Sequence, residues 1–510
     1  MDIRQGFTGI EKAVGRLSPV QKFLLGTDGS VTQLLEAVTG HPVAVATLEQ
    51  NVVPADAAVA ARLGIRAKES VNHRVVELKN ADTGEVLMYA VSDTPISRLS
   101  PEFKDDLMRA DIPIGKIIKQ HHIEARREIL AARVTPASEE AGRIFAINKD
   151  EPVLSRQYQI IHDKKPLIFI EEQFPYNRFP DTRRVIIRTP SRVHISLIDM
   201  HGGLGRVDGG VGITLDDPGV LIEAELAPAV AVQGGDPATR ERIGRVARDV
   251  LTQLGTGGGV RITVRSDFPA HVGLGSGSQV SLAVARAIAE LHGRDLSVPD
   301  LARLAGRGGT SGIGTAAFEQ GGFILDGGHR FGAGCEKSDF RPPAASRGVS
   351  PPPVLARHGF PEDWKVLLAI PSVPAGASGK AETDIFRDNC PVSLSEVREV
   401  CHEVMMRMLP GIAEHDLDLF GSSVNAIQGL GFKKVELSLQ PQQVTGLLPL
   451  LRDAGAAGAG LSSFGPTVYA IGDTGMSSVE QAARSFMKEN GGGTAILTAA
   501  RNTGAKVRVV

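Results

Sequence analysis

The chain has 510 residues, of which 42% are hydrophobic and 22% are charged, a composition typical of soluble globular proteins. This length exceeds a single ordinary core, so the sequence predicts two or three domains. A formal net charge of -2 at pH 7 argues against nucleic-acid binding through the overall field, and no apolar run approaches the roughly 18 residues of a membrane span.

The amino-terminal residues lack the basic and then apolar pattern of a signal peptide. The three cysteines, Cys335, Cys390 and Cys401, have no metal-ligand spacing and leave an odd number if two were bridged. Reduced thiols in a cytoplasmic protein fit both observations, and we expect neither secretion nor membrane insertion.

The first half predicts two short helices followed by strands. Ser18 before Pro19 and Ser30 before an apolar run are helix-start signals, and Gly40 ends the second helix. Alternating apolar residues around polar turns then predict two hairpins, which favour an antiparallel sheet. The paired strands are residues 74–78 with 86–91 and residues 155–161 with 167–171.

A domain boundary is expected at residues 175–184, which carry two prolines, a cluster of charges and no apolar periodicity. A proline-rich stretch at residues 341–353 is typical of an exposed loop, and a third unit begins near Trp364. The predicted domains are residues 1–180, 185–362 and 363–510.

The most informative feature is a glycine-rich turn, residues 269–278, between a strand-like run at 260–264 and a helical pattern that follows directly. Glycines let the backbone approach a bound group and point successive N–H groups into one hollow, while the helix adds its positive end. We predict a phosphate-binding loop, with a purely structural corner as the alternative. The predicted binding residues are Gly273, Leu274, Gly275, Ser276, Gly277 and Ser278.

Three clusters, at residues 189–199, 269–278 and 455–467, occur in the order found in the GHMP kinase superfamily, which the chain resembles from about Val185 onward. Four strings are more specific, and they closely resemble the β-ribofuranosylaminobenzene 5'-phosphate synthase family within that superfamily. They are SRVHISLIDMHGGLGRVDGGVGITL, GRGGTSGIGTAAFEQGGFILDGGHR, GASGKAE and GLSSFGPT. At residues 277–279 the loop departs from the kinase pattern of a serine followed by small residues, which argues against phosphoryl transfer from ATP.

The resemblance implies an enzyme of methanopterin biosynthesis that joins a para-substituted benzoate to phosphoribosyl pyrophosphate and releases carbon dioxide and pyrophosphate. Loop amides and arginines can hold such a donor, and a carboxylate can stabilise the positive charge that develops at its sugar carbon. No organic cofactor is expected, whereas Mg²⁺ is expected because it commonly accompanies pyrophosphate. The acceptor, 4-hydroxybenzoate or 4-aminobenzoate, stays open at this point.

Residues of the second half are assigned to these roles from the three clusters and the four strings. The candidate catalytic carboxylates are Asp199, Asp208 and Glu319. The candidate substrate-binding side chains are Arg192, His194, Arg206, Ser462, Ser463 and Thr467, with Arg307 as a further cation. Structural roles are the alternatives, because aspartates beside glycine cap turns, a lone histidine is often a hydrogen-bonded core residue, and hydroxyls can stabilise their own loop.

The first 180 or so residues resemble the chorismate lyase family, which splits chorismate into 4-hydroxybenzoate and pyruvate. The resemblance implies Arg74, Glu171 and a backbone donor near Ile114, in the turn that contains Gly115, and we add Arg156 from the corresponding place in the second hairpin. Arg74 is the implied carboxylate anchor and Glu171 the implied acid, although the two could instead pair across a solvated sheet. Because neighbours in a strand face opposite sides, only one of Glu171 and Glu172 can enter a shared pocket.

The sequence as a whole predicts an α+β protein, with an amino-terminal antiparallel-sheet domain similar to chorismate lyases and then a two-part GHMP kinase-like domain. The expected activity is bifunctional, with chorismate, a 4-substituted benzoate and phosphoribosyl pyrophosphate as partners. The rival hypotheses are a GHMP-type ATP-dependent kinase and a first half that senses an aromatic acid without catalysis. The family resemblance also allows a homodimer, and we expect no nucleic-acid or membrane partner.

Overall fold

The computed structural model describes residues 3–109, 112–268, 272–307, 309, 311–342, 349–374, 376 and 379–510. The chain divides into two compact units, one of Met1–Thr182 with Thr256–Gly258 and the other of Arg183–Gly255 with Gly259–Val510. The further division of the second half near residue 362 stays a prediction. Among the described residues, no helix is both long and apolar enough to cross a membrane.

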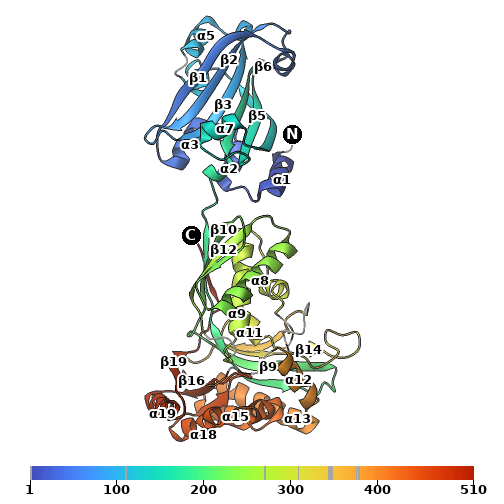
Figure 1. Ribbon diagram of the computed structural model, residues 1–510. Coiled ribbons are helices and arrows are strands. Elements are labelled where there is room, and N and C mark those ends of the chain that lie inside the picture. Colours follow the sequence, from blue (N-terminus) through green and yellow to red (C-terminus); the bar gives the residue numbers. More distant parts are fainter. Residues whose placement is uncertain are drawn as a thin grey trace. The chain divides into compact units, whose positions relative to one another are not determined.

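The first unit is built around a six-stranded sheet of order β1-β2-β3-β6-β5-β4 (Figure 1). Every neighbouring pair is antiparallel, and the two hairpins meet through the pair of β3 and β6, which confirms the predicted antiparallel sheet. The strands are β1 (Val43–Pro54), β2 (Ser70–Asn80), β3 (Val86–Pro95), β4 (Arg126–Pro136), β5 (Pro152–His162) and β6 (Lys165–Pro175).

The two predicted helices of this unit, α2 and α3, begin at the predicted signals, and α3 ends at the predicted glycine. Ser18 caps α2 through reciprocal hydrogen bonds with Gln21, Ser30 caps α3, and Gly40, at a φ of 71°, ends α3. An unpredicted helix, α1, precedes both. The helices are α1 (Ile3–Val14), α2 (Pro19–Gly26), α3 (Val31–Thr39), α4 (Ala57–Leu63), α5 (Pro101–Met108), α6 (Ile114–Gln120) and α7 (Glu139–Phe145), with short 3₁₀ turns η1 (Ile96–Arg98) and η2 (Tyr176–Arg178).

The described residues of the second unit form three sheets, which many helices accompany (Figure 1). The first sheet has the order β11-β12-β10-β7-β20, and its last strand β20 pairs with β7, the first strand of the unit. The second has the order β14-β9-β13-β15 with β8 added beside β9, and the third has the order β17-β18-β16-β19. The strands are β7 (Arg184–Arg188), β8 (Ser191–Asp199), β9 (Arg206–Leu215), β10 (Leu221–Ala227), β11 (Ala231–Gln233), β12 (Gly259–Ser266), β13 (Phe323–Asp326), β14 (His329–Arg330), β15 (Val354–His358), β16 (Lys365–Pro371), β17 (Gly458–Leu461), β18 (Val468–Gly472), β19 (Gly493–Ala499) and β20 (Lys506–Val509).

Helices α8 and α9 lie side by side and pack on the first sheet (Figure 1). Apolar side chains on almost every face of α9 are buried, so this helix forms the centre of the largest core of the unit. The helices are α8 (Pro237–Leu254), α9 (Ser276–Leu291), α10 (Val298–Leu304), α11 (Ile313–Glu319), α12 (Lys380–Asn389), α13 (Leu394–Glu403), the π-helical η4 (Val404–Met408), α14 (Leu409–Ala413), α15 (Leu417–Ile427), α16 (Gly431–Ser438), α17 (Gln442–Thr445), α18 (Leu447–Asp453) and α19 (Met476–Glu489).

The predicted α+β class is confirmed, together with the strand that precedes the glycine-rich turn and the helix that follows it. The proline-rich stretch is described only in part, since residues 343–348 lie outside the described residues. Its described residues, 341–342 and 349–353, form neither helix nor strand.

Candidate functional site

The glycine-rich turn joins β12 to α9, although Pro269, Ala270 and His271 lie outside the described residues. Gly275 caps α9 at a φ of 82°, and Gly273 has a φ of 96°, a conformation that favours glycine. A Cβ on Gly273 would overlap the carbonyl oxygen of Ser462, and one on Gly465 would overlap the backbone of Val272. Glycines are required here because the turn and the carboxy-terminal glycine loop touch backbone to backbone.

A cavity of about 350 Å³ opens over the first turn of α9. Four arginines line it, Arg192 from β8, Arg242 and Arg245 from α8, and Arg307 from the segment after α10. A Cβ on Gly277 would lie 3.0 Å from Nη1 of Arg242 and 3.3 Å from Nη2 of Arg307, so these guanidinium groups reach the helix start. Backbone amides, a helix N-terminus and four cations together suit a multiply charged anion.

Arg192 and Arg307 stay charged at neutral pH. Burial lowers the pKa of Arg192 to about 10, and burial with repulsion from Arg242 and Arg245 lowers the pKa of Arg307 to about 10. Arg192 also donates from Nη1 to the carbonyl oxygen of Gly273, which ties β8 to the turn.

Several predicted residues line the cavity: Arg192, His194, Gly273, Gly275, Ser276, Gly277, Ser278, Ser463 and Arg307. Leu274, Ser462 and Thr467 are buried and do not line it within the described structure. The Ser462 hydroxyl donates to the Gly273 carbonyl at 2.7 Å and accepts the His194 N–H at 3.0 Å, so it positions the turn instead of reaching a ligand.

His194 is buried and begins a polar chain that leads away from the cavity. Its Nε2 lies 3.1 Å from the Ser311 hydroxyl, which donates to Asp326 at 3.4 Å. Burial and the nearby cations Arg192 and Lys433 hold the pKa of His194 well below its ordinary value, so the imidazole is neutral. Burial raises the pKa of Asp326 to about 7, even though the N–H groups of Gly312 and Gly328 donate to its carboxyl group.

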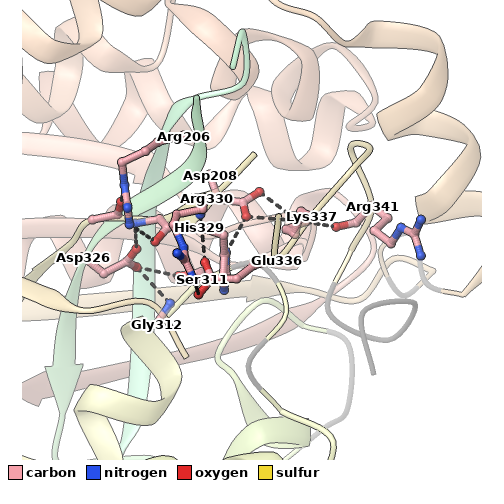
Figure 2. Close-up of polar contacts among 12 residues, drawn as sticks. Arg206, Asp208, Ser311, Gly312, Asp326, His329, Arg330, Glu336, Lys337 and Arg341 are labelled. Carbon is pink, nitrogen blue, oxygen red and sulfur yellow. Dashed lines mark hydrogen bonds and ion pairs between the residues drawn. The ribbon is translucent and has the colours of Figure 1, made fainter. Parts of the chain in front are cut away.

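None of the three predicted catalytic carboxylates lines this cavity as the described residues define it. Asp199 accepts hydrogen bonds from the N–H groups of His201 and Gly202 at 2.7 and 2.9 Å. It therefore caps a turn, which is the structural role given above as the alternative. Asp208 is buried, and its Oδ2 lies 2.7 Å from Nδ1 of His329 and 3.0 Å from Nζ of Lys337. Figure 2 shows Asp208 between these two side chains. Glu319 is exposed at the end of α11. The positions of these three carboxylates therefore do not support the predicted role of stabilising positive charge at the sugar carbon.

Arg206 is also outside the cavity. Its guanidinium donates to the carbonyl oxygens of Gly327 at 2.8 Å and Gly328 at 2.6 Å, which fixes the turn between β13 and β14 (Figure 2). A planar fork that saturates two carbonyls is a structural clamp, so its predicted contact with the donor is not supported by this geometry.

The cavity is also lined by side chains that were not predicted from the sequence. The cations Arg242 and Arg245 come from the middle of an ordinary amphipathic helix, and Glu436 comes from α16. Glu382 belongs to the string GASGKAE, which carried the family resemblance, so a signal for it was present. Leu197, Phe386 and Phe464 form an apolar wall and belong to one hydrophobic cluster.

The first unit has its own cavity, of about 80 Å³, lined by Arg74, Ile114, Gly115 and Arg127 together with apolar strand residues. Arg74 is 2% exposed and donates from Nη1 to the Ile112 carbonyl at 3.0 Å, and from Nη2 to Thr47 at 3.3 Å. A buried guanidinium in an apolar cavity suits an aromatic carboxylate.

The strand register places Glu172, not Glu171, in this cavity. Arg74 pairs with Ser92, and Ser92 pairs with Ile170, so these three side chains share one face. Glu172 follows Ile170 by two residues on that same face, whereas Glu171 points to the other face. The expectation for Glu171 as the acid at the Arg74 site is therefore wrong by one residue.

Glu172 is held by two buried partners. Arg156 donates from Nε at 2.6 Å and the Tyr158 hydroxyl donates at 3.0 Å. Arg156 is behind the cavity wall, where it also donates to the carbonyl of Thr27 at 2.7 Å. Arg156 was predicted to contact substrate, but in the structure it orients Glu172 instead. Glu171 accepts instead from Gln157 at 2.8 Å.

Comparisons with known proteins agree with this division. The Rv2949c-like chorismate pyruvate-lyase family matches residues 25–179, the GHMP kinases N terminal domain matches 241–322, and the GHMP kinases C terminal domain matches 408–498. The β-ribofuranosylphenol 5'-phosphate synthase of Methanothermobacter thermautotrophicus is 46% identical over 328 residues, 63% of this chain and 98% of that protein. The chain belongs to the β-ribofuranosylphenol 5'-phosphate synthase family.

The Methanocaldococcus jannaschii synthase of the same name is 46% identical over 334 residues, 63% of this chain and 100% of that protein. A second Methanocaldococcus jannaschii protein, named as a candidate lyase, is 36% identical over 159 residues, 30% of this chain and 77% of that protein. The resemblances to this synthase family and to chorismate lyases, stated from sequence strings, are confirmed, and the synthase-family chain is an enzyme.

The cavity of the second unit, over the first turn of α9, combines a cationic wall of four arginines with an apolar wall. Such a site can hold an anionic sugar donor and an aromatic acceptor against each other. Among the described residues, no group of three or more His, Cys, Asp or Glu side chains is arranged to hold a metal ion.

Proposed function

We propose that the second unit joins 4-hydroxybenzoate to phosphoribosyl pyrophosphate, with release of carbon dioxide and pyrophosphate. The observation that carries the proposal is the convergence of four arginines and the start of α9 on one cavity with a phenylalanine wall. The relatives are named for a ribofuranosylphenol phosphate, whose phenol ring corresponds to the hydroxy acid and not to the amino acid.

The proposed chemistry needs the cavity to hold the diphosphate and the ring at once. The sugar C1–O bond breaks and its electron pair leaves with the diphosphate, whose charge the arginines and loop amides neutralise. The ring carbon that bears the carboxylate supplies the pair for the new C–C bond. The bond to the carboxylate then breaks, its pair restores the aromatic ring, and carbon dioxide leaves.

We propose that Mg²⁺ enters with the donor. Mg²⁺ keeps several waters and is commonly bound through substrate phosphates, so the diphosphate oxygens supply its main ligands. Bound there, the ion would neutralise charge on the leaving group.

We propose that the first unit converts chorismate into 4-hydroxybenzoate and pyruvate. Arg74 and Arg127 line the same cavity and match a substrate with two carboxylates. Glu172 is the carboxylate on the cavity face, and we assign to it the role of assisting departure of the enolpyruvyl ether. The product of this unit would be the acceptor of the other.

The test incubates the purified chain with chorismate, phosphoribosyl pyrophosphate and Mg²⁺, and identifies products by mass. We expect both pyruvate and a decarboxylated ribosylphenol phosphate to form. When 4-hydroxybenzoate replaces chorismate, only the ribosylphenol phosphate should form. Consumption of ATP without any need for phosphoribosyl pyrophosphate would contradict the proposal and indicate a kinase. Ribosyl transfer without pyruvate would leave the first unit as a binding module.

A further inference from the structure

Two helices of the second unit each place a glutamate and a phenylalanine four residues apart, and therefore on one helix face. They are Glu382 with Phe386 on α12 and Phe432 with Glu436 on α16. The rings of Phe386 and Phe432 pack with centroids 4.8 Å apart, and both carboxylates line the cavity. The apolar wall therefore brings two carboxylates to the same site.

The two carboxylates differ in their partners. Glu436 is 2% exposed and forms a buried ion pair with Lys433, whose Nζ also donates to the Leu461 carbonyl at 3.0 Å. Glu382 is half-buried and makes no hydrogen bond or ion pair within the part of the chain that the structure describes. Its charge is therefore not used to hold the fold together.

The surroundings of Glu382 place it between the two walls. It is one helical turn from Phe386 in the apolar wall, and the charged groups that act on its carboxyl group are Glu436 and Arg307, which line the same cavity. Burial and the neighbouring Glu436 raise the pKa of Glu382 to about 7, while Arg307 opposes that rise. An uncommitted carboxylate that titrates near neutrality inside a cavity is a signature of a functional group.

We propose that the Glu382 carboxylate faces the anomeric carbon of the sugar donor and stabilises the positive charge that develops there. The inference rests on the proposed function of the second unit and adds the group that was missing from it. When the C1–O bond breaks, its electron pair leaves with the diphosphate towards the arginines, and C1 is left electron-poor. The ring on the phenylalanine wall attacks C1 from the other side, so the bond-forming carbon lies at the junction of the walls, where Glu382 is.

Other carboxylates fit this role less well. Glu436 is neutralised by Lys433. Within the described structure the sequence candidates do not line the cavity, since Asp199 accepts two backbone amides with Oδ1 and Asp208 is held by Lys337 and His329. Glu382 carries full negative charge to the cavity once it is ionised.

The test compares Glu382→Gln with Asp388→Asn, an exposed carboxylate on the same helix, in the full-length chain. In the Glu382→Gln variant we expect kcat for ribosyl transfer to fall on the order of 10²-fold or more. This is the size of the effect when one electrostatic stabiliser of a transition state is removed. Inorganic pyrophosphate with Mg²⁺ should bind the variant as tightly as the wild type, or more tightly, because a repelling charge is gone. The wild-type kcat should also fall below about pH 7, and this acid limb should disappear in the variant. Asp388→Asn should match the wild type.

A second variant, Glu382→Asp, keeps the charge but retracts it by one methylene, so it should keep the acid limb at a reduced kcat. A Glu382→Gln kcat within threefold of the wild type overturns the proposal. Loss of pyrophosphate binding in both Glu382→Gln and Glu382→Asp also overturns the proposal, because that result indicates that Glu382 has a structural role. If the wild type forms no ribosylphenol phosphate at all, the proposed function fails instead, and the two failures are thereby distinguished.

Discussion

Replacing Arg307 by methionine separates two effects of its guanidinium group. One is the loss of folding free energy caused by burying the charge, and the other is its contribution to anion binding. Arg307 is half-buried, donates from Nε to the Ser281 hydroxyl at 3.3 Å, and shares the cavity with Arg242 and Arg245. Its pKa is lowered to about 10, so below that pH the charged form is held in the folded chain at a cost of roughly 1–3 kcal/mol. At pH 7 the cost is fully present, and Arg307→Met should raise the free energy of unfolding by about 1 kcal/mol without ligand.

The same replacement should weaken pyrophosphate binding. One unit charge about 4 Å from another contributes roughly 4 kcal/mol at an effective dielectric constant of 20, and the three remaining arginines compensate in part. We expect affinity for inorganic pyrophosphate to fall on the order of 10²-fold, measured by calorimetry at low ionic strength. The control is Arg303→Met, which removes an exposed cation paired with Asp300. Binding within threefold of the wild type, or a parallel loss of stability and affinity, would refute the assignment of Arg307 as an anion ligand.

Three other replacements test the turn, the first cavity and the buried polar chain. Gly273→Ala should cost at least about 2 kcal/mol and lower Tm by roughly 5 °C, because a φ of 96° and the backbone of Ser462 exclude a Cβ. Glu172→Gln should stop pyruvate formation in a coupled assay and lower Tm, since it leaves a buried cation unpaired, whereas Glu171→Gln should change neither. Asp326 has a pKa raised to about 7, so the folded chain binds its proton more tightly and the stability it contributes falls as pH rises. Relative to Asp326→Asn, the wild type should therefore lose about 2–3 kcal/mol of unfolding free energy between pH 5 and pH 8 in denaturant titrations, and no such loss would contradict the burial argument.

Local signals in the sequence predicted much of the fold. The caps at Ser18 and Ser30, the strand before the glycine turn and the helix after it all appear where residue chemistry placed them. These signals act within a few residues, so a single chain suffices to interpret them. Helix α1 was not predicted, although Gly15, which follows it directly at a φ of 92° and donates to the carbonyl oxygen of Glu11, is a glycine stop.

The residues that complete the second cavity could not be found in this way. Arg242 and Arg245 lie on the long helix α8, and Glu436 lies on the short helix α16, where charged residues are ordinarily solvent-facing. Only the packing of separate elements turns them towards one space. Proximity to glycine favoured Asp199 and Asp208 instead, and the structure uses both to hold turns or buried cations.

The error between Glu171 and Glu172 has a specific physical cause. A strand with one polar face shows its parity by alternation, but β6 runs through consecutive apolar residues 167–170 before the two glutamates, and all four are buried. The pattern therefore carries no information about which glutamate shares a face with Arg74. The sheet register supplies it, because Arg74, Ser92 and Ile170 are consecutive cross-strand partners and the face alternates with every residue after Ile170. Which of two neighbouring acids faces the cavity of the first unit is thus decided by pairing across three strands, a long-range property that no window of the sequence contains.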